Sequence, residues 1–275
     1  MTLSIITINY NNCEGLQKTI DSVLSQTWTD YEWIVIDGGS TDGSRELIEQ
    51  YQEHFAYWYS EPDKGVYNAM NKGIAVAKGE YINFMNSGDC FYEAETLKKV
   101  FTPKRKADIL YGDCLKVLDH HEEILRYPQP MELYALYGRP ICHQAMMIRA
   151  SLLKDLGYDE SYTICADYKH LLEVAMKGAT FEHMGVVVCR YDMNGISSTK
   201  NELFQREWDE VHLVLPETIR VSMKQLHGYA GSRHTVRAKL LQEKGGLAAL
   251  LMKVLLALLD KLFLRTDFSK YPYCD

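Results

Sequence analysis

The stretch WIVIDGGSTDGSRE, from Trp33 to Glu46, contains a complete transition from a strand to a helix. Its first four residues are apolar and rich in β-branched side chains, which is typical of a buried strand. Asp37, two glycines and two hydroxyl residues follow as a polar turn. Asp42-Gly-Ser is a helix-start signal, because a short polar side chain can cap the first turn. This order of elements predicts the repeating unit of an α/β sheet.

Similar units recur through the first half of the chain. Short apolar runs rich in Ile, Val and Tyr occupy residues 3–8, 33–36, 56–59, 81–85 and 109–111. The stretches between the early runs place apolar residues at helical spacing. The alternation predicts an α/β fold with a mostly parallel central sheet and helices on both faces.

Composition and cysteine usage limit the class of protein. The chain has 275 residues, of which 47% are hydrophobic and 24% charged, enough for a full core. Its seven cysteines are scattered and never spaced C-x-x-C, which argues against a disulfide framework or a zinc site. The start MTLSIITINYNN resembles neither a signal peptide nor an anchor. A cytoplasmic location is therefore expected.

Charge separates the C-terminal part from the rest of the chain. The net charge is -7, but residues 228–275 carry +4, which leaves -11 for the remainder and argues against a nucleic-acid partner. We expect a globular domain over 1–227 and a basic, apolar helical extension over 228–275. Residues 247–264, LAALLMKVLLALLDKLFL, are short for a bilayer span. They predict a helix on the anionic inner face of the cytoplasmic membrane, or one packed on protein.

Polar clusters follow four successive predicted strands: NYNN at 9–12, DGGSTD at 37–42, EPDKG at 61–65 and NSGD at 86–89. Each cluster alone would be explained by a turn or a helix cap. In open α/β sheets, however, ligands bind beyond the carboxyl ends of the strands. Four such clusters together predict a ligand-binding site.

Six segments in order resemble the family 2 glycosyltransferases, which have the GT-A fold with a Rossmann-like nucleotide-binding sheet. They are SIITINYNN, VIDGGSTDGS, SEPDKGVYNAMNKGIAVAKGEYINFMNSGD, HQAMMIRASLLKDLGYDES, ADYKHLLEVAMKG and NGISST, and they cover roughly residues 3–199. The likeness extends to bacterial enzymes that build surface polysaccharides. It implies a nucleotide-sugar donor bound by residues 1–112, and a saccharide or lipid-linked saccharide acceptor bound by residues 113–227.

The resemblance assigns donor contacts to the first half. Asn9 and Asp37 would hold the nucleotide and Asp42 would support their loop, although Gly38 stands where the family commonly has a second acid. Within the segment DKGVYNAMNK, donor contacts to the diphosphate or ribose would come from Asn68, Asn71 and Lys72. The alternative is an ordinary helix face with a solvated lysine.

The resemblance also implies a metal site with a single acid. The family usually has acids at the positions of Asn86 and Gly88, and only Asp89 remains here. Magnesium often takes just one or two carboxylates, with phosphate oxygens completing its shell. Asp89 would therefore bind Mg²⁺ or Mn²⁺, which stabilises the leaving diphosphate. Asn86 would contact the ribose or a metal-bound water, and His143 the diphosphate or metal, unless that histidine is structural.

Transfer to a hydroxyl requires a general base. Asp167 matches the family's base, while Ala166 replaces the glutamate that usually precedes it; a helix N-cap is the alternative role for Asp167. Attack from the face opposite the leaving group would invert the anomeric configuration. The loop at 194–199 has the Gly/Ser content of a lid.

Two other functions are weighed against this one. A sugar nucleotidyltransferase would need a glycine-rich basic loop after the first strand, and the sequence has none there. A non-catalytic scaffold that binds nucleotide-sugars would explain the three positions where acids are replaced, namely Gly38, Gly88 and Ala166.

Overall fold

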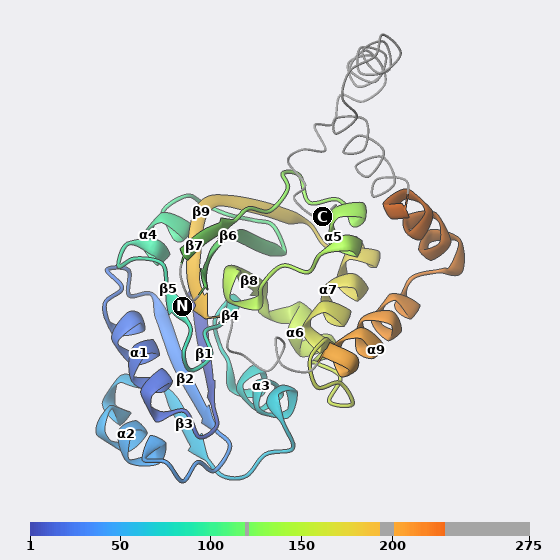
Figure 1. Cartoon of the computed structure of the whole chain (residues 1–275). Coiled ribbons are helices and arrows are strands. Elements are labelled where there is room, and N and C mark those ends of the chain that lie inside the picture. The colour runs from blue at the N-terminus through green and yellow to red at the C-terminus, as the bar shows by residue number, and fades with distance from the viewer. Residues whose placement is uncertain (119–120, 193–200, 229–275) are drawn as a thin grey trace, which may run out of the picture. The chain divides into compact units, whose positions relative to one another are not determined.

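The computed structural model describes residues 1–118, 121–192 and 201–228 (Figure 1). Residues 1–215 form one compact unit, and the second unit, which starts at Pro216, is helical over 217–228. The predicted lid at 194–199 and the apolar segment at 247–264 lie outside the described residues. In the described ranges, no helix is long and apolar enough to cross a membrane.

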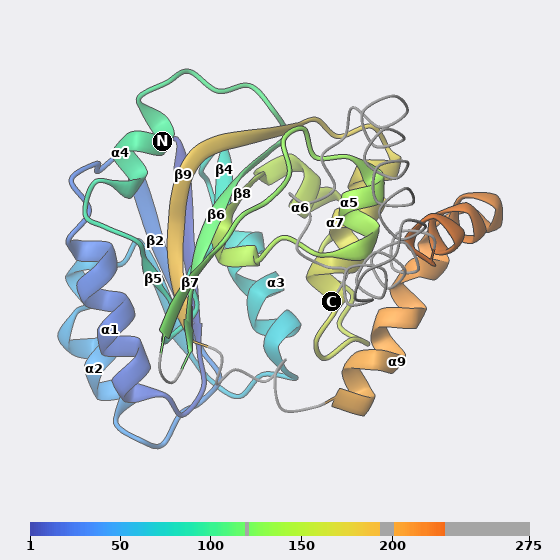
Figure 2. The same cartoon turned by 45° about the horizontal axis from the view of Figure 1, so that its top comes forward.

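The first half of the compact unit forms a parallel sheet in the order β3-β2-β1-β4. In Figure 2, α1 and α2 cover one face of this sheet and α3 covers the other. Every residue of β1 and β4 is buried, as expected for strands covered on both faces. The elements are β1 (Leu3–Asn9), α1 (Cys13–Leu24), β2 (Tyr31–Asp37), α2 (Ser44–Gln50), β3 (Tyr57–Ser60), α3 (Val66–Val76) and β4 (Tyr81–Phe84).

The second half extends the same sheet beyond β4 in the order β8-β6-β9-β5, with β7 paired to β6. Among the described strands of this part, β6 and β9 pair in parallel and the other pairs are antiparallel. Its strands are β5 (Cys90–Phe91), β6 (Ile109–Leu118), β7 (His121–Leu125), β8 (Met146–Arg149) and β9 (Phe181–Asp192). Its helices are α4 (Thr96–Phe101), α5 (Leu133–Gly138), α6 (Ala150–Leu156), α7 (Ala166–Met176) and α9 (Asn201–Val211). This part has 3-10 turns at His143–Ala145 and His212–Val214, and the first half has one at Gln52–His54.

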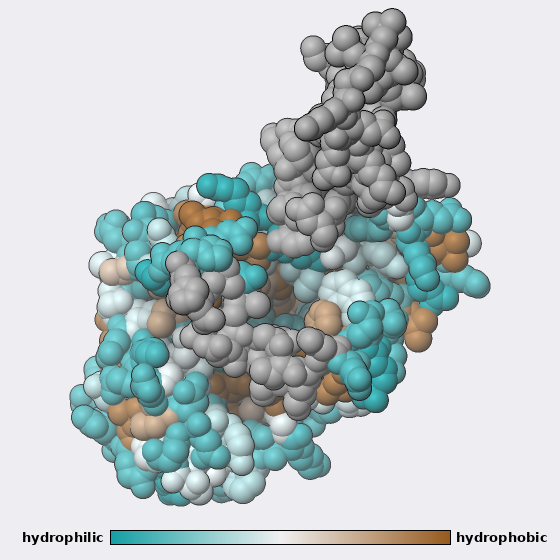
Figure 3. Space-filling model, viewed as in Figure 1, coloured by the Kyte–Doolittle hydropathy of each residue, from teal (hydrophilic) through white to brown (hydrophobic). Residues whose placement is uncertain are grey.

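The predicted α/β fold with a central sheet and flanking helices is confirmed. Strand register explains how the sheet assembles a site: Asn9 is aligned with Asp37, and Asp37 with Ser60, at the carboxyl ends of three neighbouring strands. Asn9 and Asp37, which come from two of the predicted polar clusters, are therefore neighbours at this edge of the sheet. In the view of Figure 3, the coloured surface is mainly hydrophilic, with hydrophobic residues in separate patches.

Candidate active site

Asp37 is the centre of the polar cluster at the ends of β1, β2 and β3. Its carboxylate is fully buried and accepts five hydrogen bonds. Burial raises the pKa of Asp37, but the bonds from Ser40, Asn9 and Ser60 together outweigh burial and lower it below the usual value. The donors are Asn9 Nδ2 (2.7 Å), the backbone N–H of Gly39 (3.2 Å) and of Ser40 (2.9 Å), Ser40 Oγ (2.5 Å) and Ser60 Oγ (2.7 Å).

Asp42 holds the start of α2 against the start of α1. Its carboxylate accepts from the backbone N–H of Cys13 at 2.8 Å, and from the N–H and hydroxyl of Ser44 at 3.1 and 2.6 Å. The Ser44 hydroxyl is the main reason why the pKa of Asp42 is lowered. Asp42 therefore orders the loop that follows Asp37.

Gly38 leaves room for an acid from another segment. A Cβ atom at this position would lie 2.7 Å from Oδ2 of Asp63 and 3.2 Å from the ring of Tyr10. A carboxylate from the loop between β3 and α3 thus lies beside Gly38. Asp63 was not among the predicted contacts, although the EPDKG cluster pointed to its loop.

Asn71 and Asn68 of α3 bind protein groups in this structure. Asn71 Nδ2 donates to the carbonyl of Tyr158 (2.8 Å) and to Glu160 (3.0 Å), and Asn71 Oδ1 accepts from the Tyr158 N–H (2.8 Å). Asn68 Nδ2 donates to Glu160 at 2.9 Å. Lys72 lies 3.5 Å from the carbonyl of Pro62 and 5.2 Å above the ring of Tyr59. The donor contacts assigned to these three residues of α3 stay predictions.

The NSGD cluster forms a tight turn directly after β4. The N–H of Asp89 donates to the carbonyl of Asn86 at 2.9 Å, and Gly88 has φ +101°, a value that favours glycine. Thr19 of α1 fixes the turn, because its hydroxyl accepts from the Gly88 N–H (3.0 Å) and lies 2.8 Å from the Asp89 carbonyl. An acid at position 88 would strain this turn.

The side chains of this turn face the 3-10 turn His143–Ala145. Asp89 accepts from Gln144 Nε2 at 2.9 Å, and Asn86 Nδ2 lies 3.0 Å from His143 Nε2. The Asn86 Oδ1 atom is buried and, among the described residues, has no hydrogen-bond partner. An orphaned amide oxygen and a carboxylate on one turn are oxygen ligands of the kind that Mg²⁺ and Mn²⁺ use. The described residues contain no group of three or more His, Cys, Asp or Glu able to hold a metal.

Asp167 lies at the second position of α7 and connects to the same cluster. Its Oδ2 atom is 3.3 Å from His143 Nδ1, and its Oδ1 atom is 3.0 Å from the Tyr67 hydroxyl. Burial lowers the pKa of His143, but the hydrogen bond and charge of Asp167 raise it, and the net pKa is raised. Asn86, His143 and Asp167 thus form one continuous chain of contacts from β4 to α7.

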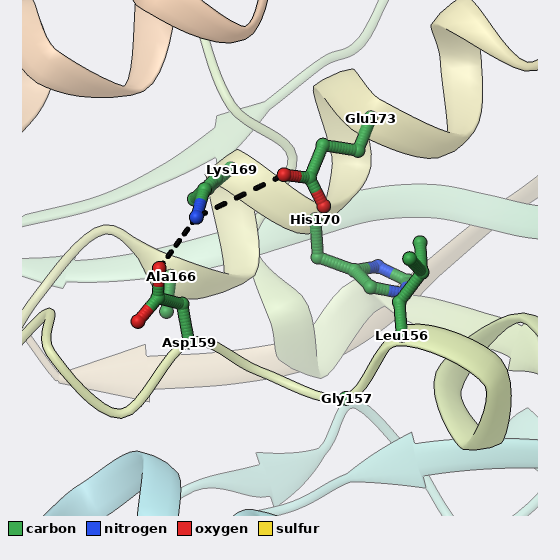
Figure 4. Close-up of a pocket in the computed structure, with 7 residues that line it drawn as sticks. All are labelled: Leu156, Gly157, Asp159, Ala166, Lys169, His170 and Glu173. Atoms are coloured by element: carbon green, nitrogen blue, oxygen red, sulfur yellow. Dashed lines mark hydrogen bonds and ion pairs between the residues drawn. The ribbon is translucent and has the colours of Figure 1, made fainter.

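A separate pocket lies between α7 and the loop after α6 (Figure 4). Its volume is about 330 Å³, and none of the predicted site residues lines it. Lys169 bridges its rim, 2.5 Å from Asp159 and 3.8 Å from Glu173. Its lining consists of Leu156, Gly157, Asp159, Ala166, Lys169, His170 and Glu173.

The model of the family described as "Glycosyl transferase family 2" matches residues 4–157. The chain belongs to this family. Two curated relatives agree with the assignment. An uncharacterized glycosyltransferase of Mycobacterium tuberculosis is 36% identical over 207 residues, which are 72% of this chain and 77% of the relative. A PGL/p-HBAD biosynthesis glycosyltransferase of Mycobacterium bovis is 31% identical over 206 residues, which are 71% of this chain and 79% of the relative.

Solved structures share the fold of this family 2 glycosyltransferase at low identity. Staphylococcus aureus TarS 1-349 in complex with UDP-GlcNAc has a TM-score of 0.63 and 19% identity, covering 81% of this chain and 70% of TarS 1-349. The mannosyltransferase PcManGT of Pyrobaculum calidifontis, in complex with GDP-Man and Mn²⁺, has a TM-score of 0.56 and 17% identity. It covers 95% of this chain and 81% of PcManGT. Both matches support the GT-A fold.

Proposed function

We propose that this family 2 glycosyltransferase transfers a sugar from a nucleotide-sugar to a saccharide or lipid-linked saccharide, with inversion and with the help of a divalent metal. The observation that carries the proposal is the contact chain Asn86–His143–Asp167. It joins the turn after β4, where the resemblance implies the donor's diphosphate, to the carboxylate that the resemblance assigns as the base. The structural neighbours bound to UDP-GlcNAc and GDP-Man support a nucleotide-sugar donor.

The proposed acceptor class rests on the resemblance to bacterial enzymes that build surface polysaccharides. One curated relative is a PGL/p-HBAD biosynthesis glycosyltransferase, which supports a role for this chain in a biosynthetic glycosyl transfer. We also propose peripheral attachment to an anionic membrane through residues 228–275, because their sequence is basic and apolar. The full-length protein should then co-sediment with anionic liposomes at low salt and be released at high salt. Absence of binding at low salt would remove this part of the proposal.

In the proposed mechanism, Asp89 and the Asn86 amide oxygen would hold the metal. A bound divalent cation supplies charge stabilisation to the leaving diphosphate. As the acceptor hydroxyl attacks the anomeric carbon, Asp167 accepts the proton of that hydroxyl. His143 fixes the orientation of Asp167 through its Nδ1–H, and the Tyr67 hydroxyl lies 3.0 Å from the other carboxylate oxygen. Attack from the face opposite the diphosphate inverts the configuration.

The replacement Asp167→Asn tests the base. Asparagine keeps the size of the side chain but cannot take up the proton, so we expect turnover to fall by about 10²- to 10⁴-fold. Nucleoside diphosphate release would be measured with UDP-GlcNAc or GDP-Man and Mn²⁺, and nucleotide affinity by calorimetry. Affinity should stay within about twofold of the wild-type value, since less than one hydrogen bond's free energy is involved. Equal loss of turnover and affinity would exclude Asp167 as the base.

Wild-type behaviour separates the other functions. A scaffold would bind the nucleotide-sugar and release no nucleoside diphosphate. A nucleotidyltransferase would instead release pyrophosphate from a nucleoside triphosphate and a sugar phosphate. Either result would overturn the proposed function.

A further inference from the structure

The segment that leads into α7 is held from another helix. Three consecutive backbone N–H groups, at Thr163, Ile164 and Cys165, donate to the carboxylate of Glu207 on α9, at 2.8, 2.8 and 3.0 Å. The Glu207 side chain is buried, with 3% of its surface exposed. Cys165 is the N-cap of α7, and in the described structure its side chain makes no capping bond. Glu207 therefore binds the N–H groups just before α7 and places a negative charge at the helix N-terminus.

The same segment is held on its other side by α3. The carbonyl of Ile164 lies 2.6 Å from the Tyr67 hydroxyl, which is also 3.0 Å from Oδ1 of Asp167. Ile164 is thus fixed by Glu207 through its N–H and by Tyr67 through its carbonyl. The next peptides lead directly into the turn of α7 that carries Asp167.

Further side-chain contacts hold α7 in place. Trp208 stacks on Tyr168 with ring centroids 4.9 Å apart, and the Tyr168 hydroxyl lies 2.9 Å from His212 Nε2. Glu207 and Trp208 thus bind the residues on both sides of Ala166 and Asp167. The orientation of the carboxylate at 167 depends on the position of α9.

We propose that Glu207 is a positioning residue for the general base, an inference that rests on the proposed function. This chain has Ala166 directly before the base, so the residue next to Asp167 supplies no carboxylate. Glu207 supplies a carboxylate to the same helix end from a distant element. Because a base must lie within hydrogen-bond reach of the proton that it removes, a small rotation of this helix end suffices to slow the reaction.

The test compares Glu207→Ala and Glu207→Gln with Glu210→Ala, an exposed acid on the same helix that pairs with Arg206. Turnover is measured as nucleoside diphosphate release from UDP-GlcNAc and GDP-Man with Mn²⁺. We expect kcat to fall by about 100-fold in Glu207→Ala. The amide of Glu207→Gln keeps one acceptor oxygen, so a loss of about tenfold is expected. Donor KM should stay within about twofold in both variants, and Glu210→Ala should match the wild type.

A readout independent of activity accompanies the kinetics. Hydrogen exchange at the amides of residues 163–165 should accelerate in Glu207→Ala and less in Glu207→Gln, with other core amides unchanged. If Glu207→Ala fails to fold, Glu207→Gln carries the test. Wild-type kcat in a folded Glu207 variant would overturn the inference, as would a parallel loss of kcat and donor affinity.

The proposed function and this inference fail in different ways. A wild-type protein inactive with both donors would overturn the proposed function. If, in addition, hydrogen exchange at the amides of residues 163–165 were as slow in Glu207→Ala as in the wild type, the inference that Glu207 holds this segment would also be overturned. An active wild type with unaffected Glu207 variants would overturn only the inference.

Discussion

Asp37 carries a buried negative charge that five hydrogen bonds stabilise. These bonds join the end of β2 to the ends of β1 and β3 and to the loop after β2. The carboxylate therefore organises the end of the site where the donor is predicted to bind. A direct contact of Asp37 with the nucleotide stays a prediction.

The replacement Asp37→Asn should destabilise the protein by about 3 kcal/mol at pH 7, because an amide nitrogen would face buried donors. The pKa of Asp37 is lowered in the folded state, so its carboxylate stabilises the fold above the unfolded value of 3.8. This stabilisation is lost as pH falls from 3.8 through the folded-state pKa. Denaturant unfolding of both proteins between pH 7 and pH 3 measures the difference.

Asp63→Asn is the matched control for this prediction. Asp63 is half-buried beside Gly38 and accepts from the Gly65 N–H, so a change below about 1 kcal/mol is expected. A difference between wild type and Asp37→Asn that stays constant from pH 7 to pH 3 would contradict the role of the charge.

Three positions lack an acid that the family resemblance led us to expect, and each has a local explanation. At Gly38 the space is taken by Asp63. At Gly88 the turn requires a positive φ. At Ala166 a carboxylate reaches the helix end from α9. These departures do not by themselves indicate a decayed site.

At the scale of elements, α3 fixes the loop between α6 and α7. We expect Asn71→Ala to lower the free energy of unfolding by about 2 kcal/mol, because it leaves the N–H and carbonyl of Tyr158 unpaired. Asn68→Ala, whose partner Glu160 is exposed, should cost about 0.5 kcal/mol. Denaturant unfolding measures the stability of each variant, and calorimetry with UDP or GDP and Mn²⁺ measures its nucleotide affinity. Weakened nucleotide binding with unchanged stability would assign Asn71 to the donor site instead.

Hydrophobic runs predicted β1, β2 and β4 because those strands are buried on both faces, and a similar run predicted β3 although this edge strand is only partly buried. The later strands are harder to predict from the sequence. β7 (HEEIL) is charged and mostly exposed, β8 has four residues, and β9 shifts register against β6 on either side of Asp113. Their formation depends on neighbouring strands more than on intrinsic pattern.

The site, too, could be predicted from the sequence only where it depends on local pattern. Acids and amides after strands were visible in the sequence, since their position follows from the strand ends. Tyr67, Gln144 and Glu207 were missed because each acts across segments distant in the chain. Periodicity carries no information on such contacts.

At the scale of the whole molecule, metal and nucleotide should stabilise the fold together. With Asp89 as the single acid of the predicted site, Mn²⁺ alone should shift the melting temperature little. Mn²⁺ with UDP or GDP should stabilise by about 2.7 kcal/mol at 100 times the Kd. Asp89→Ala should abolish the metal-dependent part. A full shift with Mn²⁺ alone, or one that survives Asp89→Ala, would contradict this site.

Both halves of the enzyme share one sheet, and their seam lies between β4 and β8. The buried Asn83 amide in β4 donates to the carbonyls of Gln144 and Met146, at 3.0 and 2.8 Å. Chimeras that exchange the second half of the sheet between relatives must therefore preserve these two hydrogen bonds. Grafting loops onto an intact sheet is the safer route to new sugar linkages.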